Sequence, residues 1–377
     1  MKVLIVMSGF FPGKKYGGPP VSVDNFCTLM DEFDCYIVCR DHDMGKTTRY
    51  SNIHRGWNKR SNCMVWYLND YQYNEEGFDK IIQKLKPDIL YLQGLFQLCV
   101  FPCLKLAKKY SIKVLLAPRG ELCTGAFRKK YKKIPYIIVL KMLGLLKDIY
   151  FQSTSEEETN AIERWLGTSK RKIYYLTNIP SIPKEEYSHP QKQSGNARLI
   201  FLSRIIWKKN LLFAIQCLKE IRGSVQFDIY GPIEDKEYWQ KCQREIKTLP
   251  NNIKVNYCGL IGHDEVHKTF ARYDAFLFPT LSENFGHVIA EALSVGCPVI
   301  ISDQTPFVDV EKYGAGYVIS LENIHQFTCA INKVIIATND DFQIWRKNTL
   351  EYFENKLSVV ELKRVYMECF KCIYNKF

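Results

Sequence analysis

The sequence predicts an α/β protein built from two Rossmann-like domains that face each other across a cleft. Short apolar runs alternate with helical patterns along the whole chain, which is typical of βαβ units and parallel sheets. The 377 residues exceed what a single core comfortably holds and suit two domains. A polar segment with several prolines interrupts the alternation near the middle of the chain, and it predicts a linker.

The first half contains seven apolar runs of strand length. Each run has four or five residues, as expected for strands that are buried on both faces of a parallel sheet. We expect these strands at residues 3–7, 35–39, 64–68, 89–92, 114–117, 149–152 and 173–176.

The second half repeats the pattern after the proline-containing segment and ends in an amphipathic helix. We expect its strands at residues 199–202, 225–230, 253–257, 275–278, 299–301 and 317–319. The predicted division is an N-terminal domain at 1–180, a linker at 181–197, a C-terminal domain at 198–357 and a last helix at 358–377.

Composition indicates a globular protein that binds an anionic partner. Hydrophobic residues make up 46% of the chain and aromatic residues 14%, which excludes a disordered protein. The 14 cysteines are scattered through apolar segments and no export signal precedes them, so we expect reduced core residues in a cytoplasmic protein. The net charge of +12 favours nucleic acid, anionic lipid or a phosphorylated substrate as partner. No apolar run approaches the roughly 18–20 residues of a membrane span.

Two glutamates, Glu283 and Glu291, follow the strand predicted at 275–278, at the edge where parallel sheets bind ligands. If a helix starts near Phe285, Glu283 lies just before its first turn and Glu291 about two turns along, roughly 12 Å away. The helix N-terminus between them offers free N–H groups to a diphosphate. The arrangement suits a nucleotide sugar. An acidic helix cap is the alternative, but it accounts only for Glu283.

The segment Ser282–Ala292 resembles the large retaining glycosyltransferase family often called group 1, or family four. The family carries two glutamates at this spacing, and the chain adds Gly296-Cys297-Pro298-Val299-Ile300 after them. The resemblance extends over nearly the whole chain and points to the bacterial polysaccharide-assembly type. It implies the GT-B architecture, in which residues 358–377 would cross back to the N-terminal domain.

Two cations, Arg204 and Lys209, lie on the loop after the strand predicted at 199–202. A planar guanidinium and a mobile ammonium at this spacing can converge on one phosphate pair. A solvated basic loop is the alternative. The resemblance implies the first interpretation, because the family grips the donor diphosphate with an Arg-x4-Lys motif. The usual glycine after the lysine is Asn210 here, which tolerates a left-handed backbone.

The resemblance also implies substrate contacts on other loops. We expect Glu283 and the backbone N–H groups of the next three residues to orient the transferred sugar, and Glu291 to bind ribose hydroxyls. Arg119 would bind an acceptor phosphate or steady the leaving group, with an ion pair to Glu121 as the alternative. The full set of expected substrate-binding residues is Gly17, Gly18, Arg119, Gly231, Gly259, Asn284, Phe285, Gly286, His287 and Glu291.

Metal binding is expected at none of the candidate positions. The Asp41-His42-Asp43 triplet matches a metal motif of another glycosyltransferase architecture, but a polar loop at a strand end explains it equally well. His263 and His267 lie four residues apart without a third ligand. We therefore expect neither a metal nor a cofactor.

A basic segment at residues 127–133 precedes an interrupted apolar helical pattern at 134–146. Basic residues beside an amphipathic helix predict binding to an anionic membrane surface. The alternative is a solvated face on a core helix. The resemblance favours the membrane, since many members of the family glycosylate lipid-linked acceptors, and it implies a cytoplasmic protein at the inner face of the plasma membrane.

The resemblance implies a hexosyltransferase-type enzyme that moves a sugar, with retention of configuration, from a nucleoside-diphosphate donor to an acceptor hydroxyl. The acceptor would be a lipid-linked or other saccharide in surface-polysaccharide biosynthesis, and no nucleic acid would bind. Arg204, Lys209 and the helix N-terminus would stabilise the leaving diphosphate. The alternatives are a GT-B nucleotide-sugar epimerase or phosphorylase, and an inactive basic module that binds nucleic acid or membrane.

Overall fold

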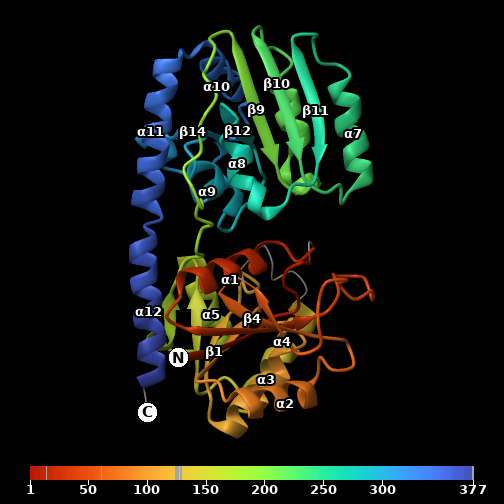
Figure 1. Ribbon diagram of the computed structural model, residues 1–377, viewed down its shortest axis with the longest axis vertical. Helices are drawn as coiled ribbons and strands as arrows, with labels where there is room; N and C mark the ends of the chain where they lie inside the picture. The colour runs from red at the N-terminus through yellow and green to blue at the C-terminus, as the bar shows by residue number, and fades with distance from the viewer. Residues whose placement is uncertain (14, 61, 124–126, 128–129, 376–377) are drawn as a thin grey trace. The chain divides into compact units, whose positions relative to one another are not determined.

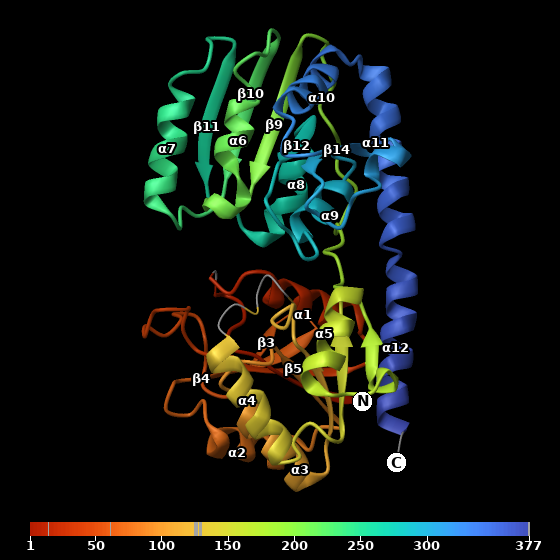
Figure 2. The same ribbon diagram turned by 180° about the vertical axis from the view of Figure 1, so that it is seen from behind.

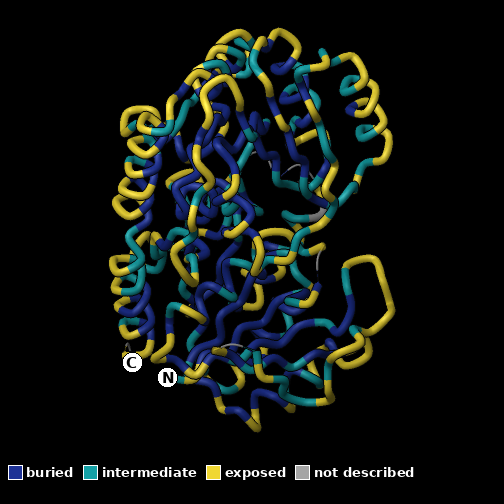
Figure 3. Tube along the Cα trace, turned by 45° about the horizontal axis from the view of Figure 1, so that its top comes forward, coloured by how far each residue is buried: buried dark blue, intermediate teal, exposed yellow. Residues whose placement is uncertain are grey.

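The computed structural model describes residues 1–377 except positions 14, 61, 124–126, 128–129 and 376–377. The chain forms two compact units, each with its own core (Figure 1). Unit 1 comprises Met1–Ile179 together with Val359–Phe377, and unit 2 comprises Pro180–Ser358. In both units the central strands are buried, and exposed residues lie on the helices and loops around them (Figure 3).

Unit 1 is built on an eight-stranded sheet with the strand order β3-β4-β2-β1-β5-β6-β7-β8. All neighbouring strands are parallel except β3, which pairs antiparallel with β4. The strands are β1 (Lys2–Val6), β2 (Asp34–Arg40), β3 (Trp57–Arg60), β4 (Cys63–Leu68), β5 (Ile89–Gln93), β6 (Lys113–Ala117), β7 (Ile149–Ser153) and β8 (Ile173–Tyr175).

Alternate strand residues supply two separate cores on the two faces of this sheet. Val3 and Ile5 of β1 belong to the core with α1 (Gly18–Leu29) and the C-terminal helix α12 (Val359–Asn375). Leu4 and Val6 belong to the core on the other face. The helices that contribute to that core are α2 (Glu75–Leu85), α3 (Val100–Tyr110), α4 (Lys130–Met142) and α5 (Glu156–Leu166) (Figure 2).

Strand β3 was not predicted from the sequence. Its residues, Trp57–Arg60, are mostly polar and lie at the sheet edge, so they need not form the continuous apolar run of a central strand.

Unit 2 contains a six-stranded parallel sheet with the order β11-β10-β9-β12-β13-β14. Numbered from β9, this order is the 3-2-1-4-5-6 of dinucleotide-binding folds, and it reverses direction between β9 and β12. The strands are β9 (Asn196–Leu202), β10 (Ser224–Tyr230), β11 (Ile253–Gly259), β12 (Ala275–Phe278), β13 (Val299–Ser302) and β14 (Gly316–Ile319).

One large hydrophobic core joins this sheet to its helices. Short 3₁₀ turns, labelled η, occupy several of the loops. The helices are α6 (Leu211–Gln216), α7 (Lys236–Ile246), α8 (Val266–Phe270), α9 (His287–Leu293), α10 (Ile324–Ile336) and α11 (Asn339–Lys356).

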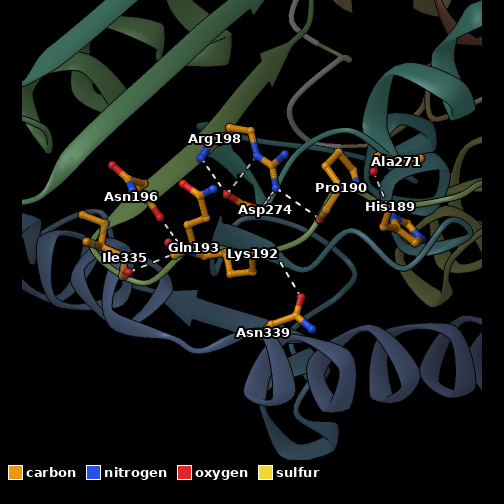
Figure 4. Close-up of polar contacts among 10 residues, drawn as sticks. All are labelled: His189, Pro190, Lys192, Gln193, Asn196, Arg198, Ala271, Asp274, Ile335 and Asn339. Atoms are coloured by element: carbon orange, nitrogen blue, oxygen red, sulfur yellow. Dashed lines mark hydrogen bonds and ion pairs between the residues drawn. The ribbon is translucent and has the colours of Figure 1, made fainter.

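The segment that enters unit 2 is hydrogen-bonded to it well before β9 begins (Figure 4). His189 Nδ1 lies 2.8 Å from the carbonyl oxygen of Ala271, and the backbone N–H of Lys192 donates to Asn339 Oδ1 at 3.1 Å. The buried ammonium of Lys192 donates to backbone carbonyls, including that of Gln193 at 2.9 Å. Much of the proline-containing segment is therefore a fixed part of unit 2.

Among the described residues, no helix combines the length and the apolar character that crossing a bilayer requires.

The loop after β10 approaches the loop after β9 so closely that only glycine fits at position 231. Gly231 has a φ of 134°, and a Cβ added there would lie 1.8 Å from the carbonyl oxygen of Ser203. The N–H of Gly231 donates to the carbonyl oxygen of Gly259 at 2.8 Å, which joins the ends of β10 and β11. Gly259 also has a positive φ, 75°, but a Cβ there would meet nothing within 4 Å.

We predict that Gly231→Ala destabilises unit 2 by roughly 3 kcal/mol, because it adds a steric clash to backbone strain. The matched variant Gly259→Ala should cost only about 1 kcal/mol of left-handed strain. Urea denaturation of the two variants beside the wild type measures the difference. Equal stability of the two variants would show that the close approach to Ser203 does not constrain position 231.

Candidate functional site

The candidate site lies where the strand order of unit 2 reverses. In open parallel sheets, ligands bind outside the carboxyl ends of the strands at this point. Strands β9 and β12 are hydrogen-bonded neighbours there, and the loop after β9 carries Arg204 and Lys209 while the loop after β12 carries Glu283. The topology therefore brings two segments that are distant in sequence to one edge of the sheet.

The loop after β9 is short and tied to the loop after β12. It forms the 3₁₀ turn η2 (Trp207–Lys209), which ends at Asn210 with a left-handed φ of 59°. The side-chain amide of Asn210 donates to the carbonyl oxygen of Pro279 at 2.9 Å. The backbone N–H of Leu281 donates to the carbonyl oxygen of Lys208 at 3.0 Å. Asn210 thus adopts the conformation for which glycine is usual, and its side chain adds a bond that glycine lacks.

Lys209 and Glu283 form a direct ion pair between these two loops, with the ammonium Nζ hydrogen-bonded to Glu283 Oε1. The side chains are only 11% and 14% exposed, and the Lys209 Nζ lies 5.5 Å from the centroid of the Phe278 ring. Each charge is poorly hydrated, so removing either partner would leave the other charge poorly compensated. The structure brings these two predicted residues together.

Arg204 does not join this pair. Its guanidinium Nη1 lies 3.2 Å from Oε2 of Glu234, and these side chains are 42% and 31% exposed. The structure therefore does not bring Arg204 and Lys209 together, and each cation pairs with its own carboxylate.

The helix after Glu283 begins two residues later than the sequence predicted. Helix α9 starts at His287, and Gly286 precedes it as the N-cap residue with a left-handed φ of 76°. The prediction of a start near Phe285 was wrong because a residue with this φ cannot continue a right-handed helix. Glu291 consequently lies just over one turn into α9.

Glu291 is buried beneath the site edge. It is only 5% exposed, and its Oε1 lies 3.9 Å from Nδ1 of His263 on the 3₁₀ turn η3 (His263–Glu265). Burial raises the pKa of the Glu291 carboxyl to about 8, so the neutral acid predominates at pH 7. The proximity of His263 to Glu291 was not predicted from the sequence, in which His263 was a candidate only for metal binding.

The residues between the two glutamates differ in exposure. Asn284 is exposed. The ring of Phe285 packs against that of His287 with centroids 4.6 Å apart, and against that of Phe307 at 6.4 Å. His287 is thus part of an aromatic cluster at the start of α9.

The predicted residues of the N-terminal half lie in unit 1. Gly17 is the N-cap residue of α1 with a φ of 70°, and Gly18 is the first residue of that helix. Arg119 follows β6 and has a left-handed φ of 56°.

Arg119 is held by neutral acceptors. Its Nε and Nη2 donate to Gln93 Oε1 at 2.8 and 2.6 Å, its Nη1 donates to Asn178 Oδ1, and its Nη2 also donates to the Tyr91 hydroxyl at 3.4 Å. The alternative of an ion pair with Glu121 is wrong. The Glu121 carboxylate instead accepts hydrogen bonds from the side chain of Gln97 and from two backbone N–H groups.

The candidate metal ligands contact each other or neighbouring side chains. Asp41 Oδ1 lies 3.0 Å from His42 Nδ1, and Asp43 Oδ1 accepts from the backbone N–H of Lys15 at 3.1 Å. Burial lowers the pKa of His267 to about 4. Among the described residues, no three His, Cys, Asp or Glu side chains are grouped to hold a metal ion.

Solved structures with the same fold cover the whole chain. Sucrose-phosphate synthase from Thermosynechococcus elongatus is 15% identical, with a TM-score of 0.74 over 98% of this chain and 99% of that one. Anabaena Alr3699/HepE in complex with UDP and glucose is also 15% identical, with a TM-score of 0.73 over 99% of this chain and 100% of that one. The prediction of a GT-B fold with two parallel α/β sheets is confirmed.

Sequence comparison supports the same family. An uncharacterized 41.2 kDa protein in the cps region of Klebsiella pneumoniae is 23% identical over 377 residues, which cover 94% of this chain and 96% of that protein. The family model described as "Glycosyl transferases group 1" matches residues 184–350, which include the Lys209–Glu283 pair and Glu291. The resemblance to the group 1 glycosyltransferases inferred from the sequence motifs is confirmed.

Proposed function

We propose that this glycosyltransferase moves a sugar from a UDP-sugar to an acceptor hydroxyl with retention of configuration. The observation that carries the proposal is the Lys209–Glu283 pair at the strand-order reversal of unit 2. The structure of HepE, which has the same fold, was determined with UDP and glucose, and this supports uridine as the donor base.

Lys209 would bind the diphosphate of the donor. Glu283 neutralises this ammonium in the structure, so an arriving diphosphate would compete with Glu283 for it. Arg204, with its exposed guanidinium on the same loop, would turn from Glu234 to the second phosphate. Two cations then stabilise the charge that develops as the bond from the sugar C1 to the diphosphate breaks.

Glu283 would orient the transferred sugar once Lys209 turns to the diphosphate. The backbone N–H groups of Asn284, Phe285 and Gly286 precede α9 and would contribute to the same sugar site. His287 would complete this side of the site. Gly231 and Gly259, at the ends of β10 and β11, would bind the base through their backbone.

Glu291 would bind the ribose as a neutral acid. A protonated carboxyl both donates and accepts hydrogen bonds, and ribose hydroxyls do the same. His263, 3.9 Å away, would fix the orientation of this carboxyl.

The acceptor is proposed to be a saccharide in surface-polysaccharide biosynthesis, carried on a lipid. The similar protein from the cps region, a capsule polysaccharide locus, supports this setting. Gly17, Gly18 and Arg119 of unit 1 are the proposed contacts on the acceptor side.

Helix α4 is proposed to dock unit 1 on an anionic bilayer. Its outer face exposes several large apolar side chains beside the exposed Lys141, which matches an interfacial helix. These side chains are Tyr131, Ile138, Val139 and Met142, followed by Leu143 just beyond the helix.

Lys133 is the one basic residue of the segment before this apolar face whose side chain the structure describes. Lys133 points inward: its Nζ donates to the carbonyl oxygen of Glu121 at 3.0 Å and lies 4.5 Å from the centroid of the Phe96 ring. Arg128 and Lys129 lie outside the described residues, as do the side chains of Lys130 and Lys132. The apolar face of α4 therefore carries the membrane proposal.

A panel of UDP-, GDP- and ADP-sugars, screened for thermal stabilisation, tests the proposed donor. A UDP-sugar should raise the melting temperature most, since bound ligand stabilises the native state.

With that donor and a saccharide-lipid acceptor, NMR should show a product with the anomeric configuration of the donor. The reaction should proceed in EDTA, because Arg204 and Lys209 supply the positive charge. Free sugar as the main product would instead favour an epimerase or phosphorylase.

In the same assay, Glu283→Ala and Lys209→Ala should each remove most transfer, at least 100-fold, because each contact acts on the reacting groups. Glu234→Ala is the matched control: it removes an ion-pair partner from the same edge but should retain most activity. Near-normal turnover of Glu283→Ala with the best donor would show that the site is wrongly assigned.

We predict that Glu291 makes the stability of unit 2 fall as pH rises. The folded carboxyl, with its pKa near 8, keeps its proton where the unfolded one, near pH 4.5, has lost it. Its contribution is therefore complete below about pH 4.5 and lost by about pH 8, at a slope of about 1.4 kcal/mol per pH unit. Denaturation from pH 5 to 8 should show wild type losing stability relative to Glu291→Gln. The control variant Glu351→Gln, at an exposed position, should show the same dependence of stability on pH as wild type. The prediction would be refuted if Glu291→Gln also showed the wild-type dependence.

We predict that Val139→Glu/Met142→Glu abolishes binding to vesicles rich in phosphatidylglycerol, because two carboxylates replace apolar side chains at an anionic surface. The control is Ile336→Glu/Ile344→Glu, which changes two exposed apolar residues of unit 2. Flotation with vesicles measures both. Equal flotation of the two variants, or no flotation of wild type, would contradict membrane docking through α4.

A further inference from the structure

A buried chain of hydrogen bonds connects the C-terminal helix α12 to Arg119. The Tyr366 hydroxyl on α12 accepts from Gln152 Nε2 at 2.9 Å, and Gln152 Oε1 accepts from the Tyr91 hydroxyl at 2.5 Å. Tyr91 in turn accepts from Arg119 Nη2 at 3.4 Å. Tyr366, Gln152 and Tyr91 are at most 2% exposed, so water cannot readily replace any of these bonds.

A second route leads from the same hydroxyl to Arg119. Tyr366 donates to the carbonyl oxygen of Thr177 at 2.8 Å, and Gln152 Nε2 also donates to that of Leu176 at 2.8 Å. These two bonds fix the segment after β8, where Asn178 accepts from Arg119 Nη1. Tyr366 therefore acts on two of the three side chains that hold the guanidinium.

The backbone of Arg119 is also held in an unfavourable conformation. Its φ of 56° is left-handed and that of Gly120 is 74°. The N–H of Gly120 donates at 2.6 Å to the buried carboxylate of Glu158, whose other oxygen binds Thr154. Strain of this kind persists where surrounding bonds determine the conformation, and it is common where a side chain must be aimed.

The hydrogen-bond partners of Arg119 orient its guanidinium but do not neutralise its positive charge. Gln93, Asn178 and Tyr91 are neutral, and within the described part of the chain no carboxylate pairs with this guanidinium. The nearby carboxylate of Glu121 instead accepts from the backbone N–H groups of Leu95 and Phe96. A half-buried cation that is oriented but not neutralised is suited to a phosphate group.

We propose that Tyr366 is a positioning residue, which aims Arg119 at a phosphate group of a substrate through Gln152 and Tyr91 and through Thr177 and Asn178. The proposal rests on the proposed function for the presence of a phosphorylated substrate. That phosphate belongs either to the donor or to the acceptor. Helix α12 would thereby support the substrate site of unit 1 through hydrogen bonds to the residues that hold Arg119.

Tyr366→Phe tests this proposal, because it removes the hydroxyl and keeps the ring that packs 5.7 Å from Phe26. The matched control is Tyr174→Phe. The Tyr174 hydroxyl of unit 1 also bonds α12, because it donates to Cys372 Sγ at 3.2 Å. A structural role alone would affect the two variants alike.

The first readout is the NMR signal of the Arg119 Nε–H group, identified by its loss in Arg119→Lys. Inorganic pyrophosphate, added with and without saturating UDP, serves as the probe. The wild-type signal should shift when pyrophosphate is added. Tyr366→Phe should make that shift about tenfold smaller at the same pyrophosphate concentration, whereas Tyr174→Phe should leave the shift unchanged. Absence of a wild-type response, or equal responses in the two variants, would overturn the proposal whether or not the protein transfers sugar.

The second readout separates the two sources of phosphate in the transfer reaction. Tyr366→Phe should raise one KM about tenfold, that of the acceptor if its phosphate binds Arg119 or that of the UDP-sugar if the donor does, with kcat changed less. Tyr174→Phe should change neither. Loss of kcat alone, or equal effects in both variants, would contradict the positioning role. A wild type without transfer would refute the proposed function and leave the NMR result to decide the role of Tyr366.

Discussion

The ion pair between Lys209 and Glu283 is the constraint on which the candidate site depends. It joins loops that follow β9 and β12, the strands between which the sheet order reverses, and it shields two opposite charges from water. A pair of this kind contributes little net stability, because desolvation offsets most of the attraction. Under the proposed function, the pair would keep a cation ready at the sheet edge until a diphosphate replaces the carboxylate.

Unit 1 also holds a candidate cation, Arg119, in a fixed orientation, but with different partners. Arg119 is oriented entirely by neutral groups, and the carboxylate nearest to it in sequence, Glu121, binds backbone N–H groups instead. Under the proposed function the two units offer cations of different kinds: Lys209 would exchange Glu283 for a diphosphate, and Arg119 would meet a phosphate with its orientation already set. The first arrangement would favour reversible capture of a leaving group, and the second would favour recognition of a fixed phosphate.

Much of the fold could be predicted from sequence, because buried parallel strands must be continuous apolar runs. Every predicted strand is present, and among the described residues only the polar edge strand β3 was missed. The start of α9 was misplaced because local pattern did not reveal the left-handed Gly286. The motifs predicted that Lys209 and Glu283 serve one site. They could not predict the partners of Arg119, which come from β5 and from the segment after β8, since contacts at that sequence separation leave no local pattern.

The most direct test of this account is the affinity for UDP, measured by calorimetry, of wild type, Lys209→Met and Glu283→Gln. If Lys209 binds the diphosphate and Glu283 competes for it, Lys209→Met should lose at least tenfold in affinity. Glu283→Gln should bind UDP as tightly as wild type or more tightly, because the competing carboxylate is gone. Equal losses in both variants, or no loss in Lys209→Met, would contradict the assignment of this pair to the donor site.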